Sequence, residues 1–298
     1  MNLTIIFQQL VNGISLGSLY GLIAIGYTMV YGVIRLINFA HGDIMMVGMY
    51  FAFVGVSMMF MPWWAAFLLS MVATAIVGVL VDKIAYKPLR NASRISALIT
   101  AIGVSFFFEN LFLVIFGGVP KAFPVPQLFS GAINIHGVIF PNIAIITPIV
   151  SMIFLGILLL ILHKTKYGMA MRALSLDMET VRIMGVNVDL IISLVFAIGS
   201  FLAALSGIFW AMRYPAINPL IGIMPGLKAF AAAVLGGIGS VAGAAIGGFI
   251  IGITEILVVA FFPSLAGYKD AFAFLFLIFV LLFKPTGIMG EDLERGRF

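Results

Sequence analysis

The 298-residue chain has no cysteine, and only 9% of its residues are charged. The absence of cysteine excludes disulfides, thiolate metal sites and thiol chemistry. The scarcity of charge excludes a water-soluble fold, because soluble domains carry about 25% charged residues. Histidine is also scarce, and the three histidines lie in separate segments, so the sequence offers no metal cluster. We therefore expect neither a metal nor another cofactor.

The chain consists largely of long apolar segments. The chain is 63% hydrophobic with a mean hydropathy of +1.23. The runs are continuously apolar and about 20 residues long, which fits membrane-spanning helices and not the alternating strands of a barrel. The sequence predicts an all-α, polytopic transmembrane bundle, a single transmembrane domain over residues 1–298. About eight spans are expected, at residues 5–34, 39–61, 63–82, 95–116, 141–162, 190–211, 241–262 and 268–284.

Lysine and arginine gather on one side of the predicted bundle. Eleven of the 16 lie in the loops 82–94 and 164–189 and in the C-terminal tail, which includes Arg295 and Arg297. The positive-inside rule places these segments in the cytoplasm and the N-terminus outside. The opposite loops are expected to carry the remaining four loop cations, Lys121, Arg213, Lys228 and Lys269.

This assignment leaves too few residues for two full spans between positions 227 and 262. Thirty-six helical residues reach about 54 Å, which is less than two crossings of a bilayer core of about 30 Å plus a turn. The sequence therefore predicts a short half-helix at 227–235, a break at Gly236–Ser240 and then a longer helix.

A polar stretch, VIRLINFAHGD, marks a second break near the N-terminus. Asn38 can cap a helix that starts at Phe39, and Asp43 falls in the first turn of that helix, where the dipole favours it. His41 could face the same cavity as Asn38 or serve as a structural hydrogen bonder. Arg35 is expected to reach the cytoplasmic headgroups.

Glycine recurs at every fourth position beside both breaks. Such tracks let helix backbones approach closely, so they fit either general helix packing or two central helices that line a pathway. The glycines are Gly13, Gly17 and Gly21 in the first span and Gly239, Gly243 and Gly247 after the second break.

Paired broken segments often mark the substrate route of a transporter. We therefore expect the two breaks to face each other across a translocation path, where exposed amides and helix ends solvate a charged solute weakly. The candidate path residues are Asn38, His41, Gly236, Gly237, Gly239 and Ser240.

Two acidic residues fall within the predicted spans. Glu109 and Glu255 lie inside apolar spans, where each is either a proton site or a hydrogen-bonded packing residue.

In loop 164–189, a helix is expected from about Ala170 to Met184. Its amphipathic pattern fits a helix that lies on the membrane or docks into a groove of a partner.

Several segments resemble the permease subunits of branched-chain amino acid ABC importers, the LivH type. The most specific are INFAHGD and KAFAAAVLGGIGS, and the resemblance covers most of the chain. It implies a bacterial inner-membrane subunit that pairs with a homologous second permease and two ATP-binding subunits. An external solute-binding protein would deliver leucine, isoleucine or valine. By resemblance, Arg172, Asp177 and Gly185 belong to the loop that contacts the ATPases.

The energy for transport must come from elsewhere, because no G-x-x-x-x-G-K-[ST] motif occurs in the chain. We therefore expect no enzymatic activity. Two alternatives remain at this point. The chain could be a permease for urea, a sugar or another amino acid, or an ion-coupled secondary transporter with Asp43, Glu109 and Glu255 as ion sites.

Overall fold

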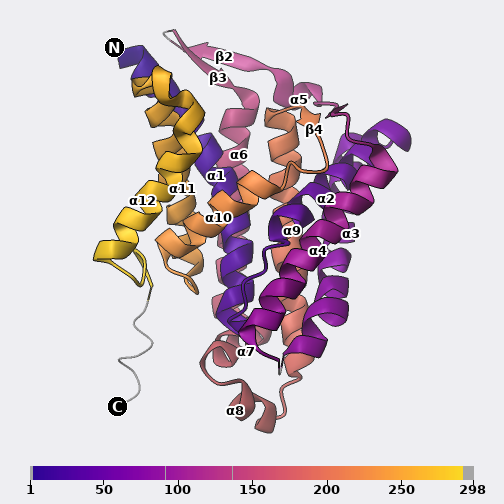
Figure 1. Ribbon diagram of the computed structural model, residues 1–298. Helices are drawn as coiled ribbons and strands as arrows, with labels where there is room; N and C mark the ends of the chain where they lie inside the picture. The colour runs from indigo at the N-terminus through magenta and orange to yellow at the C-terminus, as the bar shows by residue number, and fades with distance from the viewer. Residues whose placement is uncertain (1–2, 91, 136, 291–298) are drawn as a thin grey trace.

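The computed structural model describes residues 3–90, 92–135 and 137–290 (Figure 1). Within them, eight helices are long and apolar enough to cross a membrane, which confirms the predicted all-α bundle and its spans. They are α1 (Leu3–Ile34), α2 (His41–Phe53) with the π-helical turn η1 (Val54–Met58), α3 (Trp63–Val81), α4 (Arg94–Phe116), α6 (Asn142–Lys164), α9 (Val188–Arg213), α11 (Val241–Phe261) and α12 (Lys269–Phe283).

Short elements close the two ends of the bundle. We call one end the hairpin end, because β2 (Ala132–Ile135) and β3 (Val138–Pro141) pair there as an antiparallel hairpin, and the other the α7–α8 end (Figure 1). Gln8 of α1 holds the hairpin through two 2.7 Å hydrogen bonds with the backbone of Ile139. The remaining short elements are η2 (Asp82–Tyr86), η3 (Lys87–Leu89), β1 (Lys121–Ala122), α5 (Gln127–Ser130), β4 (Ala216–Ile217) and η4 (Pro263–Tyr268).

Helices α1 and α11 pack against each other in opposite directions. A Cβ atom built on Gly17 would lie 2.7 Å from the Cα of Phe249, and one built on Gly252 would lie 2.3 Å from the Cα of Gly17. Any larger side chain at these positions would force the two backbones apart. Gly13 and Gly21 also lie against α11.

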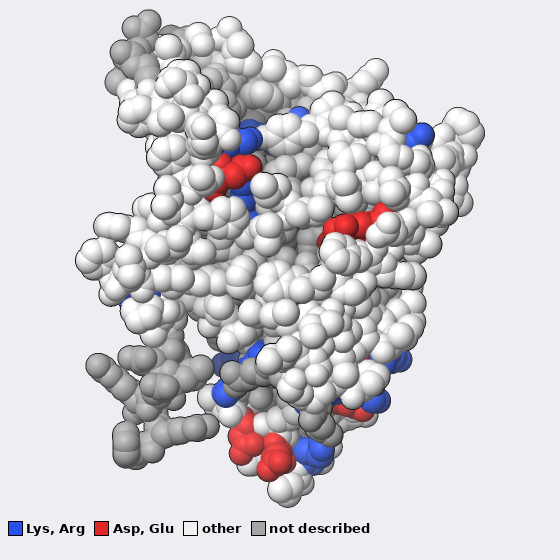
Figure 2. Space-filling model, in the orientation of Figure 1, with Lys and Arg blue, Asp and Glu red and all other residues white. Residues whose placement is uncertain are grey.

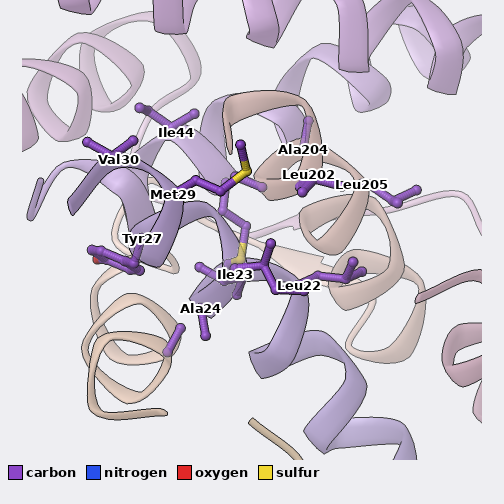
Figure 3. Close-up of a cluster of buried hydrophobic side chains, with 14 of the residues drawn as sticks. Leu22, Ile23, Ala24, Tyr27, Met29, Val30, Ile44, Leu202, Ala204 and Leu205 are labelled. Carbon is purple, nitrogen blue, oxygen red and sulfur yellow. The ribbon is translucent and has the colours of Figure 1, made fainter. Parts of the chain in front are cut away.

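Around this pair lies a continuous apolar core (Figure 3). Side chains of α1 meet side chains of α9 there, and both sets are almost fully buried. Because the spans α4, α6 and α12 lie at the periphery and expose most of their residues, the core belongs to the central helices. Figure 3 labels the α1 residues Leu22, Ile23, Ala24, Tyr27, Met29 and Val30, Ile44 of α2, and the α9 residues Leu202, Ala204 and Leu205.

The predicted half-helix is present as α10 (Ile223–Gly236), followed by a break and then α11. Gly243 and Gly247 of α11 face the backbone of α10, since Cβ atoms built on them would lie 2.3 and 2.0 Å from carbonyl oxygens of Gly236 and Ala232. One expectation was wrong. Lys228 does not lie in an outer loop but is a buried residue within α10.

The α7–α8 end differs from the single helix expected between Ala170 and Met184. The chain forms α7 (Lys166–Leu176) and α8 (Met178–Ile183), separated by Asp177. Charged atoms gather at this end of the molecule, whereas most of the surface between the two ends is uncharged (Figure 2). Arg295 and Arg297 of the tail lie outside the described residues.

Candidate functional site

The first break, residues 35–40, turns back into the bundle. His41, the first residue of α2, lies against Gly26, because a Cβ built on Gly26 would be 2.2 Å from the His41 Nε2 atom. Gly26 precedes the end of α1 at Ile34 by about 12 Å of helix. Helix α2 therefore begins well inside the span of α1.

Asn38 does not cap the helix, contrary to the prediction. The helix starts at His41 and not at Phe39, and its N-cap residue Ala40 offers no side-chain hydrogen bond. The Asn38 Oδ1 atom instead accepts a 2.9 Å hydrogen bond from the hydroxyl of Tyr86 in η2. Asn38 thus ties the break to the loop that follows α3.

His41 and Asp43 are also enclosed by protein. The His41 ring packs edge-on against Tyr27, with ring centroids 4.8 Å apart, and its Nε2 atom has no hydrogen-bond partner among the described residues. Asp43 lies in the first turn of α2, as predicted, and its Oδ2 atom accepts a hydrogen bond from Ser105 of α4. A buried polar atom without a hydrogen-bond partner is costly, so both residues are destabilising where they lie.

The second break, residues 237–240, is a tight turn built from glycine. Gly237 has φ +109° and Gly239 has φ +99°, values that L-residues rarely adopt. Ser240 then caps α11 by accepting a 3.1 Å hydrogen bond from the Gly243 amide. The sequence prediction of a helix start at this position is confirmed.

The C-terminal segment completes this turn from the outside. The amide of Ile288 donates to the carbonyl of Leu235 at 2.9 Å, and the amide of Met289 donates to the carbonyl of Gly236 at 2.8 Å. These are two of the last carbonyls of α10, which would otherwise lack partners at a helix end. The segment that follows α12 therefore holds the end of the half-helix.

The two breaks lie close to each other at the end of α1. A Cβ built on Gly32 would be 3.5 Å from the Cα of Gly239. A cavity of about 10 Å³ lies between the breaks, enough for about one water molecule. Its lining includes Ile37 and Ile238, one residue from each break, but neither Asn38 nor His41.

A buried charge network, which the sequence did not predict, surrounds Glu255. The Lys228 Nζ atom lies 2.8 Å from the Glu255 Oε2 atom and 2.5 Å from the Asp270 Oδ1 atom. Lys269 approaches the other Glu255 oxygen at 3.2 Å, and the Tyr20 hydroxyl donates to Oε2 at 2.9 Å. The two lysines neutralise the two carboxylates, and the network joins α1, α10, α11 and α12.

At the α7–α8 end, Asp177 caps α8. Its carboxylate accepts hydrogen bonds from the amides of Glu179 and Thr180 and from the Thr180 hydroxyl. These bonds to Thr180 hold the pKa of Asp177 below its usual value. A lowered pKa means that the cap is fully formed at neutral pH and is lost only as the pH falls through that lowered pKa. Gly185, at φ +84°, follows the end of α8.

The α7–α8 segment is connected to the first break. The Arg35 guanidinium donates a 3.1 Å hydrogen bond to the carbonyl of Ser175 in α7, a partner that the sequence did not suggest. The segment also presents exposed apolar side chains at its tip, and Arg172 is exposed beside them. The largest of these apolar side chains are Tyr167, Met169, Leu176, Ile183 and Met184. Leu174 and Val181 of the same segment are buried.

Eight spanning helices with two breaks inside the bundle define a class, the multi-pass helical permeases. The chain belongs to the family described as branched-chain amino acid transport system / permease component, whose model matches residues 9–281. It is a multi-pass protein of the inner membrane. Among the described residues, no group of three potential ligands is placed to hold a metal ion.

Similar proteins cover almost the whole chain. The high-affinity branched-chain amino acid transport system permease protein BraD of Pseudomonas aeruginosa is 43% identical over 297 residues, 95% of each chain. The corresponding protein LivH of Escherichia coli K12 is 42% identical over 298 residues, again 95% of each chain. A probable LivH permease of Methanocaldococcus jannaschii is 29% identical and covers 92% of this chain and 89% of its own.

Proposed function

We propose that this chain is the membrane-spanning subunit of an ATP-driven ABC importer for the branched-chain amino acids leucine, isoleucine and valine. The 43% identity to BraD over 95% of both chains is the observation that carries the proposal. The chain acts as one permease domain and forms the path together with a homologous second permease. Two ATP-binding subunits supply the energy, and an external solute-binding protein supplies the amino acid.

The path runs between the two breaks. Asn38, His41 and the backbone of Gly236, Gly237, Gly239 and Ser240 contact the amino acid as it passes, because they offer polar groups close to the small cavity between the breaks. That cavity has room for about one water molecule, far less than an amino acid needs. The described conformation is therefore a closed one, and transport requires the breaks to separate.

The α7–α8 segment couples ATP hydrolysis to this separation. Exposed apolar side chains at a charged, membrane-distal tip are typical of a surface that another protein covers. Arg172, Asp177 and Gly185 shape this tip, and Asp177 does so by capping α8. The ATP-binding subunits dock here.

The geometry argues against one of the ion sites that an ion-coupled secondary transporter would use. Glu255, one of its candidate ion sites, already interacts with Lys228, Lys269 and Tyr20. A carboxylate that is neutralised by lysine has little affinity left for a cation.

Uptake by proteoliposomes tests the proposal. Vesicles that contain this chain, the second permease and the ATP-binding subunits should accumulate leucine only when the binding protein and ATP are both present. Leucine uptake driven by a proton or sodium gradient without the partner subunits would contradict the proposal. A panel of amino acids, sugars and urea in the same assay separates the branched-chain substrate from the other solutes.

A matched pair of substitutions tests the docking surface. Ile183 in α8 and Phe60 near the hairpin end are 87% and 88% exposed, so a lysine at either position should leave the fold intact. Ile183→Lys should reduce co-purification of the ATP-binding subunits about tenfold, whereas Phe60→Lys should not. Equal co-purification by both variants would exclude the α7–α8 tip as the docking surface.

Cysteine labelling tests the path, because the chain contains no native cysteine. Ser240→Cys should react with a small polar thiol reagent in the closed state, since this position is partly exposed. Asn38→Cys, at a position that is 2% exposed, should react only when ATP opens the path. If neither cysteine reacts in any state while both variants transport leucine, the breaks do not line the path.

A further inference from the structure

The outer face of α4 carries residues that do not suit contact with lipid. Gly103, Phe106 and Asn110 follow each other at intervals of three and four residues, so they share one face of the helix. A Cβ built on Gly103 would meet no atom within 4 Å, and the Phe106 side chain is 58% exposed. Within the described chain, this face is uncovered.

Asn110 lies at a depth where lipid offers it no hydrogen bond. It precedes the end of α4 at Phe116 by about 9 Å in a helix of about 34 Å, which places it inside the hydrocarbon core. Its Nδ2 atom donates to the carbonyl of Phe106 in the same helix at 2.8 Å. An exposed amide and a small residue on one face are the features by which membrane helices recognise each other.

Two carboxylates lie beside this face. The Ser105 hydroxyl of α4 binds the Asp43 Oδ2 atom, and the buried Oδ1 atom of Asp43 has no hydrogen-bond partner among the described residues. Glu109 is one turn further along α4. The ion pairs of the described residues include neither carboxylate. Figure 2 shows acidic atoms at mid-height over α4.

Intramembrane carboxylates normally face protein or water and find a partner there. The other buried carboxylates of the chain follow this rule, since Glu255 pairs with Lys228 and Asp82 pairs with Arg90. Asp43 and Glu109 are the exceptions within the described residues. Of the two, Glu109 is the one that a positive charge or a hydrogen-bond donor from another chain can reach, since it is 8% exposed and Asp43 is 2% exposed.

We propose that the α4 face formed by Gly103, Phe106 and Asn110, with Glu109 at its edge, is the surface on which the second, homologous permease packs. This inference rests on the proposed function, which requires such a partner. Lipid would offer no hydrogen-bond donor to the side-chain oxygen of Asn110. A second copy of this chain, related by a two-fold axis, would bring like carboxylates together. A homologous chain can match the helix packing and present a cation or a hydrogen-bond donor to Glu109.

Photo-crosslinking in the complete importer tests this surface. Phe106 and Phe279 are matched positions, because both are aromatic and lie 58% and 59% exposed on spanning helices, α4 and α12. Each is replaced in turn by benzoylphenylalanine, and adducts are identified by mass spectrometry in native membranes. Position 106 should give an adduct with the second permease at least fivefold more abundant than position 279 gives.

Three other results would overturn the inference. They are adducts of position 106 with lipid alone, adducts with a second copy of this chain, and equal adducts from both positions. Co-purification of the second permease and leucine uptake are measured on the same preparations. If both persist while the crosslink fails, the surface assignment is wrong and the proposed function stands. If no second permease co-purifies with the unsubstituted chain, both are wrong.

A substitution at Asn110 gives an independent measurement. Asn110→Leu should still insert and fold, since the position is exposed and its only described side-chain hydrogen bond is to its own helix. The yield of co-purified second permease should fall at least fivefold, and Asn110→Gln, which restores an amide, should recover part of it. An unchanged yield in a folded Asn110→Leu chain would contradict the proposal.

Discussion

The first break of the bundle is held by side chains that reach elements of the α7–α8 end, and the second is held mainly by glycine conformation and backbone hydrogen bonds. In the first, Tyr86 donates to Asn38, and Arg35 donates to a carbonyl of α7. Both partners come from elements at the α7–α8 end. The shape of this break therefore depends on where those elements lie.

The second break depends on its own chain conformation. Two glycines with positive φ make the turn, Ser240 caps the next helix, and backbone amides of residues 288 and 289 complete the end of α10. The buried Lys228–Glu255 pair fixes α10 to α11. No side chain from α7 or α8 is part of this arrangement in the described residues.

This difference assigns separate roles to the two breaks. A break that hydrogen-bonds to α7 can change shape when α7 moves, whereas a glycine turn fixed by backbone bonds keeps its shape. We infer that the first break is the moving side of the path and the second is the fixed side. The predictions below test this contrast, from the largest expected effect on stability to the smallest.

Removal of the Lys228 charge should have the largest effect. Lys228→Met leaves Glu255 and Asp270 buried or half-buried without this partner, and a broken buried pair costs about 3–5 kcal/mol. Thermal unfolding of the detergent-solubilised chain measures the loss. The double variant Lys228→Met with Glu255→Gln should be more stable than the single variant, because the buried carboxylate that has lost one of its two lysines is gone. A single variant as stable as the wild type would show that the network does not anchor α10.

A side chain at Gly237 should break the fixed side of the path. The alanine Cβ would lie 2.3 Å from the amide nitrogen of Gly290, at a φ of +109°. Strain and overpacking together should cost about 3 kcal/mol or more. Gly156→Ala in α6 is the control, since its Cβ would meet no atom within 4 Å. Gly237→Ala should express poorly in the membrane, and Gly156→Ala should express normally. Equal expression of the two variants would rule out a strained turn.

The spans and the half-helix could be predicted because they depend on chain length and on continuous apolar runs, which are local properties. The residues that hold the breaks could not. Lys228 looked like a loop residue, and its burial depends on Glu255, which is 27 positions away. Asn38 looked like a helix cap, but its side-chain oxygen accepts a hydrogen bond from Tyr86, 48 positions away. Such partners are set by tertiary packing, and a single sequence carries no signal for them.

Loss of the Tyr86 hydroxyl should loosen the moving side of the path. Tyr86→Phe leaves both side-chain polar atoms of buried Asn38 without a partner, because its Nδ2 atom already lacks one among the described residues. The expected cost is about 1–3 kcal/mol in thermal or denaturant unfolding. Tyr268→Phe removes a hydroxyl from a residue that is 65% exposed and should change nothing. Equal melting temperatures for the two variants would mean that Tyr86 does not hold the break.

Substitution of Arg35 should have the smallest effect on stability and a large effect on transport. Its hydrogen bond to Ser175 lies at the surface, so Arg35→Gln should cost less than about 1 kcal/mol. If this bond carries the motion of α7 to the first break, leucine uptake per ATP hydrolysed should fall several-fold. Lys83→Gln, which removes an exposed positive charge at the same end, is the control for net charge.

A second substitution at the same position separates coupling from strain. Arg35 has φ +54°, a conformation that glycine adopts without cost. Arg35→Gly should therefore unfold at a higher temperature than Arg35→Gln, although it loses the same hydrogen bond. If both variants are uncoupled to the same degree while their stabilities differ, the bond to Ser175 is the connection between α7 and the moving break. If uptake per ATP is unchanged in both, the first break does not follow α7 through Arg35, and the contrast between the two breaks has no role in transport.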